Sequence, residues 1–266
     1  MTRQLDLRPV VLVESDSDLS IIGSHLQDDG VRCAPGFSKS AILLAAELHR
    51  ENDDNWVVAV VDHDLAGADG SNVVATSHYD LEAEIYFKIP EKTKRYVYSF
   101  VVSEKIPHES AKAAARDSVL AARNLASTIG VMRKFAHENR LRISMSALPI
   151  AEIVDRDNDG DYVESVALVA SMKAQSPQSK DALEDAARAG LAGAEKSDLL
   201  CCGHDLLQAL CVFIGRQTGR PPRARDFARG FHACVECNDF RELSIHDPLR
   251  AWLSNLTGQE IWDCVA

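Results

Sequence analysis

The run Trp56-Val57-Val58-Ala59-Val60-Val61-Asp62-His63-Asp64 decides the fold class of this chain. Its apolar, mostly β-branched residues predict a strand that is buried on both faces, which is typical of parallel sheets. The earlier run Pro9–Val13 has the same character. Between the two runs, residues 19–26 and 41–50 carry apolar side chains at helical spacing, and residues 31–34 predict a short strand. The order β-α-β-α-β predicts an α/β fold, a parallel sheet flanked by helices.

The remainder of the chain is expected to be mainly helical. After Glu109 it is rich in alanine, with apolar residues at helical spacing. We therefore divide the chain into an α/β domain of residues 1–105 and a mainly helical region of residues 106–266, which packs on that domain and is able to add strands to its sheet. Strands are expected at 72–75, 96–102, 143–145 and 150–154, and helices at 77–87, 110–140, 177–194 and 199–216.

Composition and charge exclude several classes of protein. The chain has 266 residues, 46% of them hydrophobic, and a formal net charge of −11. Bulk charge cannot hold nucleic acid on such an acidic chain, because neutralisation of phosphates by basic side chains dominates that affinity. A membrane span needs about 18 consecutive apolar residues, and we expect none here. The N-terminal residues do not resemble a signal peptide. Seven cysteines, an odd number, do not indicate a disulfide framework, so we expect a cytoplasmic protein with reduced thiols.

Acidic residues follow the two buried strands. Glu14 comes directly after the first strand, Asp62 and Asp64 come after the third, and Asp18 lies close to Glu14 in sequence. Open parallel sheets bind ligands beyond the carboxyl ends of their strands. Carboxylates gathered there repel one another unless a cation lies among them, and their oxygens suit Mg²⁺ or Mn²⁺. A single Asp-x-Asp is better explained by helix caps or solvated loop acids, but acids at two strand ends predict a metal site.

The same residues resemble the motifs of the Toprim superfamily, the fold shared by topoisomerases, bacterial primases and overcoming-lysogenization-defect nucleases. Its pattern is a strand ending in Glu-Gly-x-x-Asp and a later strand ending in Asp-x-Asp. Residues 14–18 (ESDSD) match the first motif except that Ser15 replaces the glycine, and residues 62–64 (DHD) match the second. Residues 77–82 (SHYDLE) and 203–207 (GHDLL) resemble one Toprim-like branch in bacteria. Members of that branch occur as effectors of anti-phage defence, often beside an ATPase of the ABC type.

This resemblance implies a Mg²⁺-dependent nuclease, a hydrolase of phosphodiester bonds. The motif match covers about the first 85 residues. By the resemblance, Glu14 is the general acid or base and Asp62 and Asp64 hold the metal ion, with help from Glu14 and Asp18. Three residues of the SHYDLE segment are then expected to complete or orient the metal site. They are His78, Asp80 and Glu82.

Two basic segments are candidate contacts for nucleic-acid phosphates. In an acidic chain they are natural phosphate-binding surfaces. Each segment alone is explained equally well as a solvated face or as an interface with an acidic partner. Their residues are Lys92, Lys94 and Arg95 in the first segment and Arg220, Arg223 and Arg225 in the second.

Other functions stay open. A non-catalytic Toprim-like sensor or interaction protein that works with a partner ATPase is the main alternative, and Ser15 favours it. Hydrolysis of nucleotides or small phosphoesters by the same site is a third. The chain has no Walker loop, so an ATP-driven step would come from a partner such as an ABC-type ATPase. Late cysteines such as Cys234 and Cys237 form an incomplete zinc pattern, which favours packing. The sequence does not decide between DNA and RNA, nor the oligomeric state, a homodimer included.

Overall fold

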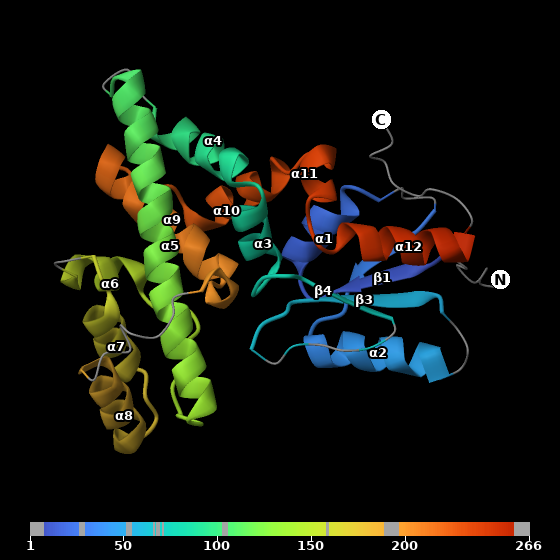
Figure 1. The fold of residues 1–266 in the computed structure, drawn as a ribbon, viewed down its shortest axis with the longest axis horizontal. Coiled ribbons are helices and arrows are strands. Elements are labelled where there is room, and N and C mark those ends of the chain that lie inside the picture. The colour runs from blue at the N-terminus through green and yellow to red at the C-terminus, as the bar shows by residue number, and fades with distance from the viewer. Residues whose placement is uncertain are drawn as a thin grey trace, which may run out of the picture. The chain divides into compact units, whose positions relative to one another are not determined.

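The computed structural model (Figure 1) describes residues 8–26, 30–51, 55–65, 67, 70, 72–102, 106–157, 160–188 and 197–257. The chain divides into two compact units. The first, called the sheet unit, comprises residues 1–88 and 232–266, and the second, called the helical unit, comprises residues 89–231. The first boundary thus lies at residue 88, where the sequence led us to expect 105, and the C-terminal segment belongs to the sheet unit. The end of the helix expected at 177–194 lies outside the described residues.

Four parallel strands form the sheet, in the order β2-β1-β3-β4. This confirms the predicted α/β class. β3 is buried along its whole length, in agreement with its uninterrupted apolar sequence. Figure 1 shows α2 on one face of the sheet and α1 and α12 on the other. The elements of the sheet unit are β1 (Val10–Val13), α1 (Asp16–Gly23), β2 (Arg32–Pro35), α2 (Lys39–Glu51), β3 (Val57–Val61), β4 (Val73–Ala75), α3 (Leu81–Lys88), α11 (Cys237–Arg241) and α12 (His246–Thr257).

Small and β-branched side chains pack the sheet against α2. Ile42 and Ala46, one turn apart on α2, form a buried cluster with Ala59 and Val61 of β3. Full burial of a Val or Ile side chain contributes about 1.5–3 kcal/mol to folding. This packing fixes α2, and with it the loop that leads from β2 into the helix, against the carboxyl half of the sheet.

The sheet has a topological switch point between β1 and β3, which are neighbours in the sheet although β2 separates them in the sequence. The chain leaves β1 toward β2 on one side and leaves β3 toward β4 on the other. The two loops therefore diverge at the carboxyl edge, which is where open α/β sheets bind ligands. Glu14 follows β1 and Asp62 follows β3, so both acids stand at this switch point.

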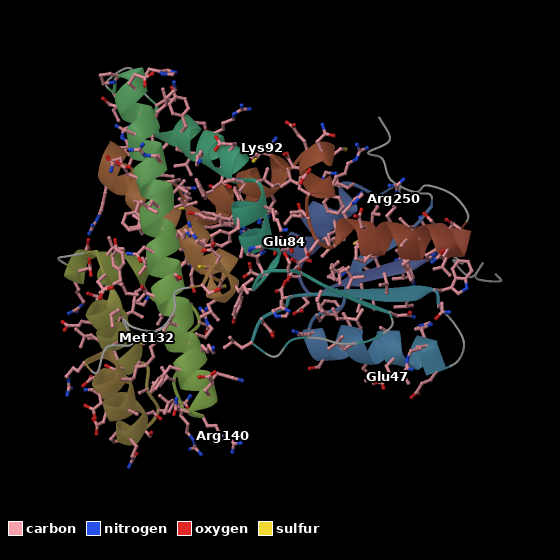
Figure 2. All side chains as sticks on the ribbon, in the orientation of Figure 1. Glu47, Glu84, Lys92, Met132, Arg140 and Arg250 are labelled. Carbon is pink, nitrogen blue, oxygen red and sulfur yellow. The ribbon has the colours of Figure 1, made fainter. Side chains whose placement is uncertain are left out.

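The helical unit is organised around α5, which packs against α4, α7 and α9. Met132 belongs to its buried stripe, and Arg140 lies just beyond its C-terminal end (Figure 2). A Cβ atom at Gly130 would overlap the carbonyl oxygen of Leu200, so the close approach of these segments requires glycine. The elements are α4 (Pro90–Val101), α5 (His108–Glu138), α6 (Ile150–Arg156), α7 (Val163–Ser171), α8 (Pro177–Arg188), η2 (Asp198–Leu200), α9 (Gly203–Thr218) and α10 (Ala224–Ala233), whose last two residues fall in the sheet unit.

A buried ion pair joins α5 to α9. An Nη2 atom of Arg133 lies 2.5 Å from Oδ2 of Asp205, which belongs to the GHDLL segment. Its neighbour His204 is exposed and contacts Gln208 of the next turn. The acid of this segment therefore serves packing within the helical unit, where loss of either partner would leave a buried charge uncompensated.

The strand expected at residues 96–102 is wrong, because this segment lies in α4. Pro90 occupies the first turn of the helix, where its missing N–H costs nothing. Thr93, Val97 and Val101 are buried at intervals of four residues, which is the spacing of one helix face. The apolar run is thus the end of an amphipathic helix whose period is hidden by the aromatic residues on its other faces.

The strand expected at 150–154 is also wrong, because these residues form most of α6. Ile150, Ile153 and Val154 are its buried side chains, again at helical spacing. In the segment 143–145, Ile143 makes an isolated bridge to Ala174. Within the described ranges, the sheet therefore receives no strand from the helical unit. The described residues also contain no helix that is long and apolar enough to cross a bilayer.

Candidate functional site

Glu14 spans the switch point. Its Oε1 atom accepts a hydrogen bond of 2.9 Å from the backbone N–H of Asp62, and so links the end of β1 to the end of β3. Burial raises the pKa of Glu14, and the charge of Asp64 adds to this, although the Asp62 N–H and Lys39 oppose it. A carboxyl group whose pKa is raised toward neutrality is suited to accept and release a proton.

Lys39 connects α2 to the acids that follow β3. Its Nζ donates a 2.7 Å hydrogen bond to the carbonyl oxygen of Asp62 and forms a 3.0 Å ion pair with Oδ1 of Asp64. Asp64 has a left-handed backbone, with φ of 34°, and its N–H donates to the carbonyl oxygen of Tyr79. The loop after β3 is therefore held from two sides, by a helix and by the segment after β4.

The carboxyl group of Asp62 lies in a strongly negative environment. Burial is the main cause that raises its pKa, to about 9, and four neighbouring carboxylates raise it further. An acid with this pKa is protonated at neutral pH unless a cation compensates the local charge. The neighbours are Asp18, Asp80, Glu14 and Glu82.

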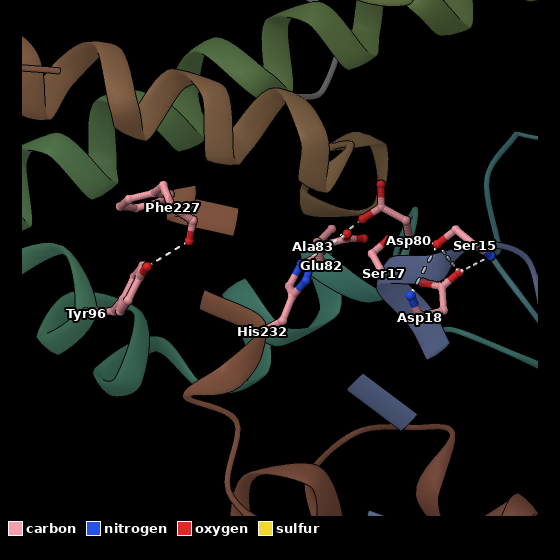
Figure 3. A network of polar contacts seen from close by, with 9 residues as sticks. All are labelled: Ser15, Ser17, Asp18, Asp80, Glu82, Ala83, Tyr96, Phe227 and His232. Carbon is pink, nitrogen blue, oxygen red and sulfur yellow. Dashed lines mark hydrogen bonds and ion pairs between the residues drawn. The ribbon is translucent and has the colours of Figure 1, made fainter. Parts of the chain in front are cut away.

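Asp18 and Ser15 form a capping box at the start of α1 (Figure 3). The Asp18 N–H donates to Ser15 Oγ at 3.2 Å, while Asp18 Oδ2 accepts from the Ser15 N–H at 3.0 Å and from its hydroxyl at 2.7 Å. Burial raises the pKa of Asp18 to about 6, and Glu82 contributes to the rise. The serine that replaces the motif glycine thus has a definite task, because it caps the helix and holds the second acid of the motif.

Substitution of Ser15 tests this task. Ser15→Ala is expected to lower the free energy of unfolding by about 1 kcal/mol, because a helix N-cap is lost, whereas Ser15→Gly costs only a few tenths. Urea titration followed by circular dichroism measures both changes. Equal losses in the two variants would contradict the capping role. Ser15→Gly is also the variant that restores the motif residue.

The SHYDLE segment separates into residues with different tasks. Oδ1 of Asp80 accepts a 2.8 Å hydrogen bond from the Ala83 N–H and caps α3 (Figure 3), so the helix expected from residue 77 begins only at Leu81. His78 has its Nδ1 atom 3.0 Å from the Ser77 hydroxyl and its ring stacked on Phe87. These contacts of His78 are made to residues nearby in the sequence. The charge of Asp80, by contrast, helps to raise the pKa of Asp62.

Glu82 is paired with His232 within the sheet unit. Its Oε1 atom lies 3.3 Å from Nε2 of His232, and both side chains are largely buried (Figure 3). Burial alone would raise the pKa of Glu82, but the hydrogen bond and charge of His232, with a hydrogen bond from Ser17, lower it. Glu82 is therefore a charged group close to Asp18 and Asp62 whose position depends on the C-terminal segment.

The loop after β4 is fixed by residues that the sequence did not single out. Thr76 Oγ1 accepts from the His63 N–H at 2.9 Å and donates to the His78 carbonyl oxygen at 2.8 Å. Glu84, labelled in Figure 2, is fully buried and accepts a hydrogen bond from the Ser77 N–H. These contacts hold the loops after β3 and β4 together, so the acids of both loops keep fixed positions.

Sequence reasoning also missed Lys39. The available signal was its place, since residues 36–39 follow β2 and thus reach the same carboxyl edge as the acids after β1 and β3. Gly36 confirms this register, because its N–H donates a 2.9 Å hydrogen bond to the Val13 carbonyl oxygen. By contrast, no local signal indicates His232, which lies far from Glu82 in the sequence.

The donor chemistry of the site fits a hard divalent cation, because its acids supply oxygen ligands and an excess of negative charge. Glu14, Asp62 and Asp64 lie at one edge, with Asp18 behind them. As the side chains stand, no three acid, histidine or cysteine side chains in the described ranges already form a metal-binding group. Part of the reason is visible, since Glu14 accepts from the backbone of Asp62 and Asp64 is paired with Lys39.

The two basic segments belong to the helical unit, where α4 and α10 pack together. The Tyr96 hydroxyl of α4 donates a 2.7 Å hydrogen bond to the Phe227 carbonyl oxygen of α10 (Figure 3). Lys94 is paired with Glu91 at 2.7 Å. The structure thus brings helices from distant parts of the sequence into contact. The basic residues they and the adjoining loop carry are Lys92, Lys94, Arg95, Arg220, Arg223 and Arg225, of which Arg95 and the last three are exposed.

Among the described residues, the late cysteines take part in no cluster that could hold a metal ion. Cys201 is buried in the helical unit, and burial raises the pKa of its thiol to about 12. Cys234 carries a thiol, whereas Cys237 is disulfide-bonded, which contradicts the expectation that the thiols are all reduced. The Sγ atom of Cys237 lies 3.9 Å from Nδ1 of His25. The observed contacts therefore agree with packing rather than a zinc site.

Fold and site together define a class of protein: an open parallel α/β sheet with an acidic edge at its switch point. Neither a protein-family model nor a curated protein matches the sequence. The resemblance to the Toprim superfamily accordingly rests on the motifs after β1, β3 and β4, and the activity it implies is a hypothesis for experiment.

Proposed function

We propose that this protein is a Mg²⁺-dependent nuclease whose active site is the carboxyl edge of the sheet unit. The observation that carries the proposal is the convergence of Glu14, Asp62 and Asp64 at the switch point, where negative charge and burial raise the pKa of Asp62 to about 9. A divalent cation relieves this repulsion and leaves the acids ionised. Mn²⁺ has the same ligand preference and is expected to replace Mg²⁺.

The residues have separate roles in this proposal. Asp62 and Asp64 would hold the ion, with Glu14 and Asp18 in support. When bound, such an ion polarises a phosphoryl oxygen and lowers the pKa of a bound water. Glu14, whose pKa is raised, moves a proton to or from an oxygen of the phosphodiester. Lys39 already places a positive charge at this edge. It is able to contact a phosphate oxygen once the metal ion, in place of Lys39, neutralises Asp64.

Two features support a nucleic-acid substrate. The motifs resemble those of Toprim nucleases. The α4 and α10 helices and the adjoining loop carry exposed basic residues such as Arg95, Arg223 and Arg225, which suit phosphate contacts in an otherwise acidic chain. A role as a cytoplasmic effector of anti-phage defence, working beside an ABC-type ATPase, is proposed on the resemblance alone.

A nuclease assay tests the proposal. The full chain is incubated with plasmid DNA, single-stranded DNA, RNA and a mononucleotide phosphoester, each with Mg²⁺, with Mn²⁺ and with EDTA. We expect cleavage of a polymer only with metal, and a loss of about 10²-fold in Asp64→Asn because one charged ligand is removed. The control is Asp16→Asn, which removes an exposed carboxylate from the first turn of α1 and is expected to cleave like the wild type.

Four outcomes would count against the nuclease. Cleavage that persists in EDTA excludes the metal site, and equal activity in the Asp64 and Asp16 variants excludes the assigned residues. Cleavage of the mononucleotide alone would replace the nuclease by a small-phosphoester hydrolase. If the chain alone is inactive, it is co-expressed with an ABC-type ATPase partner and the assay is repeated. Inactivity in this second assay refutes catalysis.

A non-catalytic interaction protein is the second candidate, and one observation favours it. Lys39 already neutralises Asp64, while Ser15 holds Asp18 in a capping box, so part of the edge is satisfied without any ion. The two candidates differ in whether Mg²⁺ stabilises the fold, because an ion that binds only the folded chain raises its melting temperature. The nuclease requires this response, and the interaction protein does not.

A further inference from the structure

Phe37 is an aromatic side chain that the fold leaves outside. It lies between β2 and α2 and is 92% exposed. Its backbone is left-handed, with φ of 69°, which is unusual for a bulky residue. The left-handed backbone is unfavourable for folding and the exposed ring gains nothing from burial to offset it, and residues strained in this way concentrate at functional sites.

Packing of the neighbouring helix does not explain Phe37. Ser38 caps α2, since its Oγ atom accepts from the Ala41 N–H at 3.3 Å. An apolar residue just before such a cap ordinarily packs on the fourth helical residue, here Ile42. Here Gly36 packs against Ile42 instead. The approach is so close that a Cβ atom on Gly36 would overlap Cγ2 of Ile42. Ile42 is thus covered by the backbone of Gly36, and the Phe37 ring is turned to the solvent.

The position of Phe37 puts it at the rim of the acidic edge. The N–H of Gly36, one residue earlier, donates to the carbonyl oxygen of Val13, the residue before Glu14. Lys39, two residues later, contacts Asp62 and Asp64. Phe37 is therefore bracketed by two residues that touch the loops carrying the proposed metal ligands.

We propose that Phe37 is a stacking platform for an unpaired base beside the cleaved phosphate, and this inference rests on the proposed nuclease function. An exposed aromatic ring binds the face of any base, so it confers affinity without sequence specificity. Bases in a duplex are stacked on one another and cannot reach the ring unless they leave the stack. Phe37 therefore gives the site a preference for single-stranded DNA or RNA over duplex.

Oligonucleotide binding tests this role. A fluorescein-labelled single-stranded oligonucleotide and its duplex are titrated with the full chain, with Ca²⁺ in place of Mg²⁺ to slow cleavage. Phe37→Ala and Phe37→Leu are expected to weaken single-strand binding by about ten- to a hundredfold, and Phe37→Trp to retain it. Duplex binding is expected to change much less. Leu44→Ala, which truncates a 56% exposed side chain on α2, is the matched control and is expected to bind like the wild type.

A second measurement reports stacking directly. In an oligonucleotide that contains 2-aminopurine, the fluorescence of that base is expected to fall when it stacks on the ring of the wild type or of Phe37→Trp, and not with Phe37→Ala. The variants are expected to melt close to the wild-type temperature, because an exposed ring contributes little to stability. Such melting temperatures show that the variants are folded. Equal single-strand affinities for wild type, Phe37→Ala and Phe37→Leu overturn the proposal, as does an equal loss on single strand and duplex. If Phe37 instead contacts a partner protein, the wild type, Phe37→Ala and Phe37→Leu are expected to bind single strands with equal affinity.

The nuclease and the stacking role fail in different ways. A chain that binds single strands through Phe37 but cleaves no nucleic acid with Mg²⁺, either alone or with an ABC-type ATPase partner, refutes the nuclease and supports the platform. Metal-dependent cleavage that is indifferent to Phe37→Ala supports the nuclease and refutes the platform. A wild-type chain that binds no oligonucleotide overturns the platform at once.

Discussion

Replacing Asp62 with asparagine is expected to lower metal-dependent cleavage by about 10³-fold or more. Metal ions stabilise charge in the transition state by several kcal/mol, and each 1.36 kcal/mol corresponds to a factor of about ten in rate. Asp62 is the acid on which the other four carboxylates act, so its loss removes the centre of the proposed metal site. The rate of cleavage at saturating Mg²⁺, compared between variant and wild type, measures the effect.

Asparagine is the appropriate replacement because the contacts of Asp62 to Glu14 and Lys39 use its backbone. The N–H that donates to Glu14 and the carbonyl oxygen that accepts from Lys39 are both retained in Asp62→Asn. The substitution thus removes a charge and keeps the switch point assembled. A loss of activity can then be assigned to the side chain.

The same variant is expected to be more stable than the wild type when metal is absent. The pKa of Asp62 is raised to about 9, so between its ordinary value near 4 and about 9 the folded chain binds more protons than the unfolded chain. Stability of the metal-free wild type therefore falls as the pH rises through this window. Asp62→Asn lacks this titration, so its melting temperature in EDTA is expected to depend less on pH.

Mg²⁺ is expected to reverse this order of stability. If the proposed metal site is correct, an ion at about one hundred times its dissociation constant stabilises the folded wild type by about 2.7 kcal/mol and leaves Asp62→Asn unchanged. Asp16→Asn is expected to respond like the wild type. Identical responses of wild type and Asp62→Asn to Mg²⁺ would refute the metal site and favour the interaction protein.

Glu84→Ala is expected to destabilise the sheet unit by about 2–4 kcal/mol. Glu84 is fully buried and accepts hydrogen bonds from the Ser77 N–H at 2.8 Å, from the Ser244 hydroxyl at 2.9 Å and from the Ser244 N–H. It thereby ties the loop after β4 to the segment that leads into α12. Hydrogen bonds to a charged group contribute about 1.5–3 kcal/mol each, and their loss leaves donors unsatisfied.

A double-mutant cycle identifies the cause of this loss. Urea unfolding is measured for Glu84→Ala, for Ser244→Ala and for the double variant. Because Ser244→Ala removes only the hydroxyl, we expect it to cost about 1 kcal/mol, with a coupling energy of about 1 kcal/mol between the two positions. Additive effects would contradict the contact, and a wild-type midpoint for Glu84→Ala would refute the structural role.

Much of the sheet unit could be predicted from the sequence. The apolar runs that became β1 and β3 predicted two buried strands. β3 is buried along its whole length, whereas in β1 only Val11 and Val13 are fully buried. The acids after these runs necessarily lie at the carboxyl ends of parallel strands. The segments at 96–102 and 150–154 were predicted wrongly, because a short apolar run has the same composition in a strand and on a helix face. Pro90 and the four-residue spacing from Thr93 to Val101 were the signals that favoured a helix.

Other features of the site depend on contacts between distant segments. His232 pairs with Glu82, and Ser244 binds Glu84, because the C-terminal segment returns to the sheet unit. Lys39 meets Asp64 only because β2 lies beside β1 and delivers α2 to the same edge. None of these three pairings leaves a local pattern, since two residues far apart in the sequence share no periodicity.

By itself, the sequence determined that this protein contains a parallel α/β sheet and that Glu14, Asp62 and Asp64 follow its strands, because hydrophobic periodicity and strand ends are local properties. Only the tertiary structure decided that β1 and β3 are neighbours, that Ser15 caps α1, and that Phe37 is exposed in the loop between β2 and α2. Strand order, burial and the electrostatic environment of a carboxyl group arise from the whole fold. These three properties determine the chemistry of the acidic edge, and they cannot be read from the sequence alone.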